Sequence, residues 1–209
     1  MIRKNKKEID LLNRLEKDIL TPVTFIQGYS AILKNSGELS KEAIQNINKI
    51  ERSSERILVT TQSLLLAYEI ESKNQKIKLE SVPVMTTTYE ALGKFIRLAK
   101  TRKIDFSLTG QNTSNVITNK KFFVQALSIL SQEILLGLEK GNIDALIKKE
   151  GGDIVITFKV VFDQKNQNKI SDTPGYQLAE LFLKKSKNKI TSSKKENIQT
   201  ISIRLITSA

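Results

Sequence analysis

The first third of the chain carries apolar residues at alternating spacings of three and four. This spacing gathers them on one stripe of an α-helix, so the segment is predicted to form long amphipathic helices. The first stripe comprises Ile9, Leu12, Leu15, Ile19, Val23, Ile26 and Leu33. After a break at Asn35-Ser36-Gly37, Ser40 is suited to cap a second helix. The second stripe comprises Ile44, Ile47, Ile50, Ile57, Leu64 and Leu65.

Two such helices with a short connection predict a helical hairpin over residues 1–72. One hairpin is too narrow to bury both stripes, and a second copy would complete a four-helix bundle. We therefore predict a homodimer. Pro22 lies inside the first helix, where it removes a backbone donor and clashes with the carbonyl four residues earlier. The sequence predicts a kink there, or alternatively a new helix that begins at Pro22 and is capped by Thr21.

Residues 73–209 alternate between strand-like and helix-like patterns. Strands are predicted at 76–80, 104–108, 116–118, 143–147, 154–162 and 200–206. Helices are predicted at 84–100, from an Asn119 cap to 138, and at 175–185. A loop is predicted at 110–115 and an irregular polar segment at 163–174. The predicted fold class is α+β, a long helical hairpin followed by an α/β sandwich in which helices cover one sheet.

The amino-acid composition excludes several kinds of functional site. The 209 residues include no His, Cys or Trp. Disulfides, thiol nucleophiles, Cys/His zinc sites and Ser-His-Asp arrangements are therefore excluded, and no metal centre is expected. Lys and Arg number 34 against 22 Asp and Glu, a net +12 that favours an acidic partner or a polyanion, although an AT-rich genome produces the same excess. The apolar runs are too short to cross a bilayer and no secretory leader is visible, so we expect a soluble cytoplasmic protein.

Several short segments, taken in their order along the chain, resemble segments of known proteins. Residues 17–23 read Lys-Asp-Ile-Leu-Thr-Pro-Val, which is similar to the His-Glu-Leu-Arg-Thr-Pro-Leu segment of sensor histidine kinases. Residues 118–127 resemble the lead into that family's asparagine box. Residues 175–179, followed by Ile190, resemble its glycine-rich box and the next strand. Nearly the whole chain thus resembles a histidine kinase core, which implies a dimerising hairpin followed by a Bergerat-type ATP-binding sandwich.

The same resemblance implies that the core is degenerate. Lys17 stands at the phosphoacceptor position, and a protonated amine has no lone pair to attack a phosphoryl group. Because the chain contains no histidine, histidine autophosphorylation is excluded.

The nucleotide-binding positions also depart from the family. Ser128 and Gln132 stand where the family has Mg²⁺-holding asparagines, and the adjacent Glu133 could hold a cation. Side chains at family glycine positions would obstruct the close backbone approach that phosphates need. We expect no cofactor, with ATP and Mg²⁺ as the alternative. The remnants of the site are Ser128, Gln132, Glu133, Asp163, Gly175 and Gln177, with Lys165 and Gln167 at two glycine positions after Asp163.

One catalytic element is intact. Asp18 and Thr21 match an acidic-x-x-Thr motif that, in the family, supports dephosphorylation of the receiver domain, where the threonine hydroxyl positions a water. Lys17 lies one helical turn before Thr21 and shares its face. The alternative interpretation is that Asp18 and Thr21 are solvated helix residues.

These observations lead to three hypotheses. The first is an inactive histidine-kinase-like protein that dimerises and binds a two-component partner, either a response regulator receiver domain or an active kinase. The second is a phosphatase of a phosphorylated receiver that uses Thr21. The third is polyanion binding through the lysine-rich residues 184–195, without sequence-specific reading of nucleic acid.

Overall fold

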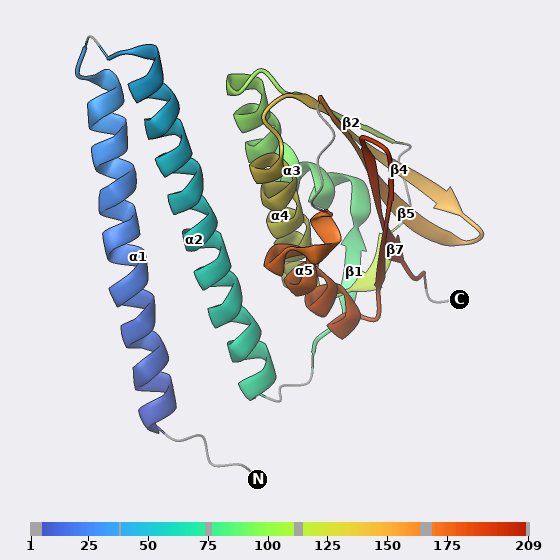
Figure 1. Ribbon diagram of the computed structural model, residues 1–209. Coiled ribbons are helices and arrows are strands. Elements are labelled where there is room, and N and C mark those ends of the chain that lie inside the picture. The colour runs from blue at the N-terminus through green and yellow to red at the C-terminus, as the bar shows by residue number, and fades with distance from the viewer. Residues whose placement is uncertain (1–5, 38, 74–76, 111–114, 164–168, 208–209) are drawn as a thin grey trace. The chain divides into compact units, whose positions relative to one another are not determined.

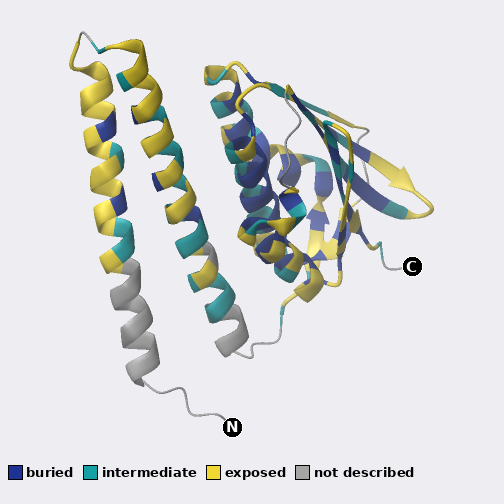
Figure 2. Ribbon diagram, viewed as in Figure 1, coloured by how far each residue is buried: buried dark blue, intermediate teal, exposed yellow. Residues whose placement is uncertain are grey.

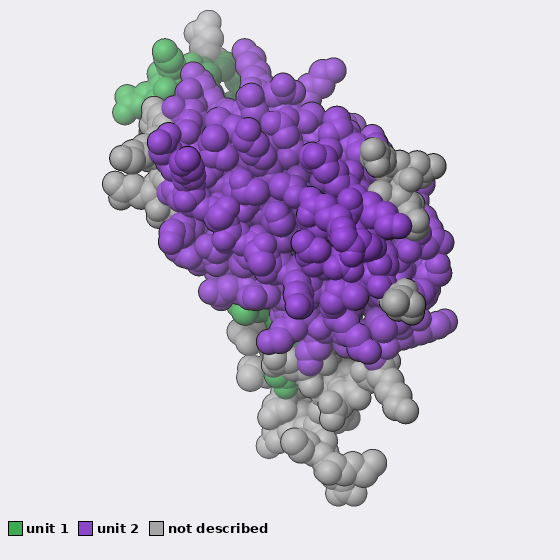
Figure 3. Space-filling model, turned by 90° about the vertical axis from the view of Figure 1, so that its right-hand side faces the viewer, with its two compact units in different colours: residues 1–75 green, residues 76–209 purple. Residues whose placement is uncertain are grey.

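A computed structural model describes residues 6–37, 39–73, 77–110, 115–163 and 169–207 (Figure 1). The chain divides into two compact units, residues 1–75 and 76–209 (Figure 3). Each unit is described by itself.

The first unit is a hairpin of two antiparallel helices, α1 (Lys6–Asn35) and α2 (Lys41–Lys73), which confirms the predicted hairpin (Figure 1). Gly37 in the connection has a φ of 112°, a conformation that favours glycine. The Ser40 hydroxyl accepts a hydrogen bond from the Ala43 amide at 3.1 Å, so the predicted cap of the second helix is present. α1 runs unbroken through Pro22, so the alternative of a new helix starting there is wrong. The kink stays a prediction.

The interior of the hairpin is narrow. Val23 and Ser30 of α1 are buried, as are Ile47 and Ser54 of α2, and each pair lies on one face of its helix. Near the connection, the Lys34 ammonium lies 2.8 Å from the Glu51 carboxylate and joins the two helices. Much of each predicted apolar stripe therefore stays outside the contact between α1 and α2.

The second unit contains three helices and seven strands among its described residues. The helices are α3 (Val84–Thr101), α4 (Lys120–Gly137) and α5 (Pro174–Lys185), with a short 3-10 turn, η1 (Ile170–Asp172). The strands are β1 (Glu80–Pro83), β2 (Asp105–Gly110), β3 (Asn115–Thr118), β4 (Gly141–Glu150), β5 (Asp153–Phe162), β6 (Lys189–Lys195) and β7 (Ile198–Leu205).

A five-stranded sheet forms the centre of this unit, in the order β2-β4-β5-β7-β6. β2 runs parallel to β4, and the other neighbours are antiparallel. α3, α4 and α5 lie on one face of the sheet, and the buried residues concentrate between the two layers (Figures 1 and 2). On β5, every second residue from Ile154 to Phe162 is buried. The predicted sandwich is confirmed, and β1 and β3 add a small antiparallel sheet that the sequence pattern did not predict.

Capping explains where α4 begins. The Asn119 side chain accepts a hydrogen bond from the Phe122 amide at 2.9 Å, as the sequence predicted. Its amide nitrogen also donates to the Lys78 carbonyl at 2.8 Å, which ties the segment before β1 to the start of α4.

One predicted strand needs correction, and one observed strand was missing from the predicted strands. Residues 77–79 have no regular structure and β1 begins at Glu80, because the register with β3 pairs Glu80 with Thr118. Residue 76 and the loop residues 111–114 lie outside the described part of the chain. Conversely, β6 lies within the lysine-rich stretch, where mostly Lys, Ser and Thr side chains hide the strand pattern. β6 is an edge strand paired with β7, so it needs little apolar surface.

Candidate functional site

The hairpin exposes a first apolar stripe on each helix. Ile50, Ile57 and Leu64 of α2 are exposed at intervals of seven residues, about a quarter turn from the buried Ile47 and Ser54. Ile26 and Leu33 of α1 are also exposed, seven residues apart and similarly displaced from Val23. Because the helices run antiparallel, these two stripes come to the same side of the hairpin. We call this set, Ile26, Leu33, Ile50, Ile57 and Leu64, the seam.

A second exposed stripe lies on α1 alone. Phe25, Tyr29 and Ile32 are exposed by 61%, 65% and 63%, respectively. Their spacing of four and three residues places them on one face, roughly opposite the face that packs on α2. The sequence contained this signal, because the three residues already show helical spacing. We call this set the outer stripe.

The predicted motif of α1 lies on the same side as the outer stripe. Lys17, Asp18 and Thr21 are all exposed, and Thr21 is one turn before Phe25. Thr24, by contrast, donates its hydroxyl hydrogen to the Leu20 carbonyl at 2.8 Å. The exposed polar motif and the outer stripe therefore form one continuous surface along α1.

In the described part of the second unit, the structure brings two of the predicted nucleotide-site remnants into close contact. Glu133 of α4 is 4% exposed and packs against Gly175 in the first turn of α5. A Cβ atom on residue 175 would lie 2.6 Å from both Cδ and Oε1 of Glu133, and closer still to Cγ. A side chain at residue 175 would therefore overlap the Glu133 side chain, and one of the two residues would have to shift.

The other remnants lie elsewhere. Ser128 and Gln132 are half-buried, share one face of α4, and point about a third of a turn away from Glu133. Gln177 is exposed, and so is Asp163 at the end of β5. Lys165 and Gln167 lie outside the described residues. In the described ranges, no three acidic side chains gather into a metal site. The close contact of Glu133 with Gly175 fills the space beside the first turn of α5.

The turn after Gly175 is anchored to the sheet. Burial raises the pKa of the Tyr176 phenol, a side-chain hydrogen bond with Ser192 of β6 lowers it, and the negative charge of Glu180 raises it further. The net direction is upward, so the phenol is neutral at pH 7. The Phe122 ring of α4 and the Phe182 ring of α5 pack with centroids 5.5 Å apart. α5 is thus held firmly against α4 and β6.

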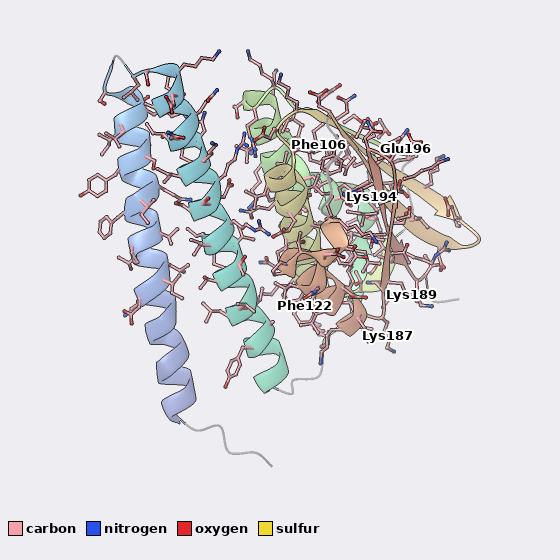
Figure 4. The ribbon with its side chains drawn as sticks, viewed as in Figure 1. Phe106, Phe122, Lys187, Lys189, Lys194 and Glu196 are labelled. Carbon is pink, nitrogen blue, oxygen red and sulfur yellow. The ribbon has the colours of Figure 1, made fainter. Side chains whose placement is uncertain are left out.

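The lysine-rich residues 184–195 span three kinds of structure: the end of α5, a turn and β6. Lys187 and Lys189 lie at one end of β6, and Lys194 and Glu196 lie at the other (Figure 4). The two ends of this strand are about 20 Å apart. Residues 76–209 hold 22 basic and 12 acidic residues, against 12 and 10 in residues 1–75, so most of the positive charge belongs to the second unit. This charge is distributed over the unit and is not gathered in one stretch.

Known proteins are similar to this chain in structure. No protein-family profile and no curated protein matches the chain. Histidine kinase AdeS of Acinetobacter baumannii superposes with a TM-score of 0.60 at 12% identity, over 92% of this chain and 98% of that chain. The chain has the fold of a histidine kinase core. Histidine kinase ThkA, solved in complex with the response regulator TrrA, superposes at 0.61 and 15% identity, over 99% of this chain and 65% of that chain.

Full-length ShkA, solved with AMPPNP, superposes at 0.63 and 11% identity, over 96% of this chain and 46% of that chain. The chain therefore spans less than half of ShkA and about two thirds of the ThkA chain. Within the described residues, no helix is long and apolar enough to cross a membrane.

Proposed function

We propose that this chain is a cytoplasmic, dimeric, catalytically inactive histidine-kinase-like protein that acts by binding a two-component partner. The partner is a response regulator receiver domain or an active kinase. Inactivity rests on composition, since the chain has no histidine to phosphorylate and Lys17 stands at the phosphoacceptor position. A nucleotide is not part of this proposed function.

Dimerisation is supported by the seam. In a four-helix bundle each helix packs on two neighbours, along faces about a quarter turn apart. Each helix of the hairpin has one buried face and one exposed apolar face in this relation. Ile50, Ile57 and Leu64 are exposed to water in the single chain. A second copy packed on the seam would bury these apolar side chains, which is favourable.

The proposed partner binding is supported by the continuous exposed surface on α1. The outer stripe is centred about a quarter turn from the α1 part of the seam, so a second copy packed on the seam would leave Phe25 and Ile32 exposed. Two exposed aromatic residues beside an aliphatic one are typical of a contact that a partner covers. The polar Lys17, Asp18 and Thr21 border the stripe, and Lys17 supplies a positive charge for an acidic partner.

We expect a double substitution, Phe25→Ser with Tyr29→Ser, to weaken partner binding at least about tenfold, because each aromatic anchor lost from an interface typically costs more than 1 kcal/mol. The measurement is calorimetric titration of the chain with purified receiver domains and kinase cores from the same organism. The exposed Gln45→Ala on α2 is the matched control and should bind as the unmodified chain does.

Both variants should remain dimeric, which separates partner binding from self-association. Absence of binding to every receiver and kinase in the panel would overturn the proposed function. Unchanged affinity of the double variant would move the contact away from the outer stripe.

A second candidate function is dephosphorylation of a receiver domain, favoured by the exposure of Thr21. Its hydroxyl lies beside Lys17 on the outer surface of α1, where it could orient a water toward an aspartyl phosphate. The receiver would bring its own Mg²⁺, so the hairpin needs only to position the water.

If this function holds, Thr21→Ala abolishes the accelerated loss of the aspartyl phosphate and leaves stability within about 0.5 kcal/mol, since the side chain is exposed. The assay follows phosphate release from a phosphorylated receiver over time. Thr24→Ala is the matched control, because that hydroxyl is engaged with the Leu20 carbonyl. Equal decay with and without the unmodified chain would eliminate the phosphatase function.

A further inference from the structure

The strand β6 forms one edge of the five-stranded sheet. One side of β6 pairs with β7, from Lys189 opposite Arg204 to Lys195 opposite Ile198. Within the described ranges, no strand lies on the other side of β6, which we call its open edge. An edge strand presents a row of backbone N–H and C=O groups with which another extended chain can pair. The open edge is therefore a place where one more strand can be added.

The hydrogen bonds of β7 show which residues of β6 face the open edge. The Phe162 amide donates to the Asn197 carbonyl at 2.9 Å, so this carbonyl points to β5 and the Ile198 amide of the same peptide group points to β6. In an antiparallel pair, hydrogen-bonded residue pairs alternate with pairs that are not hydrogen-bonded. Ile190 and Ser192 lie an odd number of residues before the partner of Ile198, so their backbone groups point to the open edge.

Two lysines lie at the ends of β6. Lys189 and Lys195 are exposed, and both alternate with the buried Ile190, which places them on the face of the sheet away from the helices. They are six residues apart, or about 20 Å along the strand. In the part of the chain that the structure describes, neither lysine forms an ion pair. By contrast, the neighbouring Arg204 lies 3.3 Å from the Asp153 carboxylate.

A second copy of β6 is a poor occupant of the open edge. An antiparallel pair of two β6 strands centred on Ser192 would place Lys189 of each copy opposite Lys195 of the other. Like charges directly opposite one another destabilise a sheet, and lysines on edge strands commonly prevent self-association in this way. The same two lysines favour an added strand that carries carboxylates opposite them.

A nucleic acid also carries negative charge, but it matches the open edge less well. Its phosphates accept hydrogen bonds and donate none, whereas Ile190 and Ser192 present carbonyl acceptors as well as N–H donors. A peptide backbone supplies both kinds of group. In addition, β6 has no aromatic side chain on which a base could stack.

We propose that the open edge of β6 binds an extended acidic peptide segment of another protein by strand addition. The backbone of the segment pairs with Ile190 and Ser192, and two carboxylates six residues apart lie opposite Lys189 and Lys195. This binding surface belongs to the second unit and is separate from the outer stripe on α1.

Fluorescence anisotropy with labelled synthetic peptides tests the proposal on the full chain. Each peptide has seven residues, as β6 has. The first has Glu at both ends and alternating Val and Thr between them. The second has Lys in place of both Glu, and the third repeats the first with N-methyl groups on the inner backbone amides. Only the first should bind saturably at up to millimolar concentration, because only it offers both carboxylates and backbone donors.

Reversal of the two charges on β6 should reverse the preference. Lys189→Glu with Lys195→Glu should bind the Glu-ended peptide at least about tenfold more weakly, because two favourable pairs become two like-charge pairs. It should gain affinity for the Lys-ended peptide. The matched control, Lys148→Glu with Lys149→Glu, makes the same change of charge on β4, which β5 and β7 separate from β6. All four lysines are exposed, so both double variants should keep the fold.

No saturable binding of the Glu-ended peptide would overturn the proposal. So would equal affinity for the N-methylated peptide, since backbone pairing would then play no part, or equal affinity of the two double variants. A single-stranded oligonucleotide that displaces the peptide more effectively than unlabelled peptide does would assign the surface to nucleic acid instead. None of these measurements uses a receiver domain or a kinase, so failure here is distinct from failure of the partner titration.

Discussion

The variant Ile57→Asp is expected to be monomeric under conditions where the unmodified chain is a dimer. Ile57 is the middle residue of the α2 part of the seam, between Ile50 and Leu64, and its side chain is 46% exposed in the single chain. A second copy would bury it among apolar side chains. An unpaired carboxylate there costs several kcal/mol, so the dimer dissociation constant should rise at least about 100-fold.

Sedimentation equilibrium over a range of concentrations measures this constant. The matched control is Ile32→Asp, which places the same carboxylate on the outer stripe, at a residue that is 63% exposed and about a third of a turn from Ile26 and Leu33, and it should leave the dimer intact. An unmodified chain that stays monomeric at high concentration would contradict the dimer. An Ile57→Asp chain that associates as tightly as the unmodified one would place the interface on another face.

The second large effect is expected at Asn188, in the turn between α5 and β6. Its side chain is buried, and its Nδ2 donates to the Thr118 hydroxyl at 2.8 Å. Its Oδ1 accepts from the Ile206 amide at 3.3 Å. Asn188→Leu removes both bonds and leaves the fully buried Thr118 hydroxyl without this donor. We expect a loss of about 2–4 kcal/mol in the free energy of unfolding.

Urea unfolding followed by circular dichroism measures this loss. Thr118→Val is the matched variant, because it removes only the hydroxyl and keeps the shape. The double variant should lose less than the two single losses combined, since both act on one hydrogen bond. A change below about 0.5 kcal/mol for Asn188→Leu would show that the bridge between β3 and the end of β7 contributes little.

The helices were largely predictable from the sequence. The spacing of apolar residues along α1 and α2 needs no tertiary information, and neither do the Ser40 and Asn119 caps, because these signals depend on neighbours within a few residues. The long β5 was predicted for the same reason, since a run rich in β-branched and aromatic residues is typical of a buried strand.

The two strands that the sequence pattern misplaced or missed depend on distant partners. β1 begins at Glu80 because it pairs with β3, more than 30 residues later. β6 is a strand because β7 supplies its hydrogen bonds, although only Ile190 among its residues is buried. Local alternation carries little information where the sheet edge is polar.

The same distinction between local and distant information applies to the candidate site. The sequence alone determined that histidine phosphorylation is impossible in this chain, because composition settles which side chains exist. It also determined that α1 and α2 have apolar faces. Only the tertiary structure decided which part of each face is buried in the hairpin, and that Glu133, not Ser128 or Gln132, meets Gly175. The physical reason is that a helix face follows from local periodicity, whereas the contact made by that face depends on the packing of segments about forty residues apart.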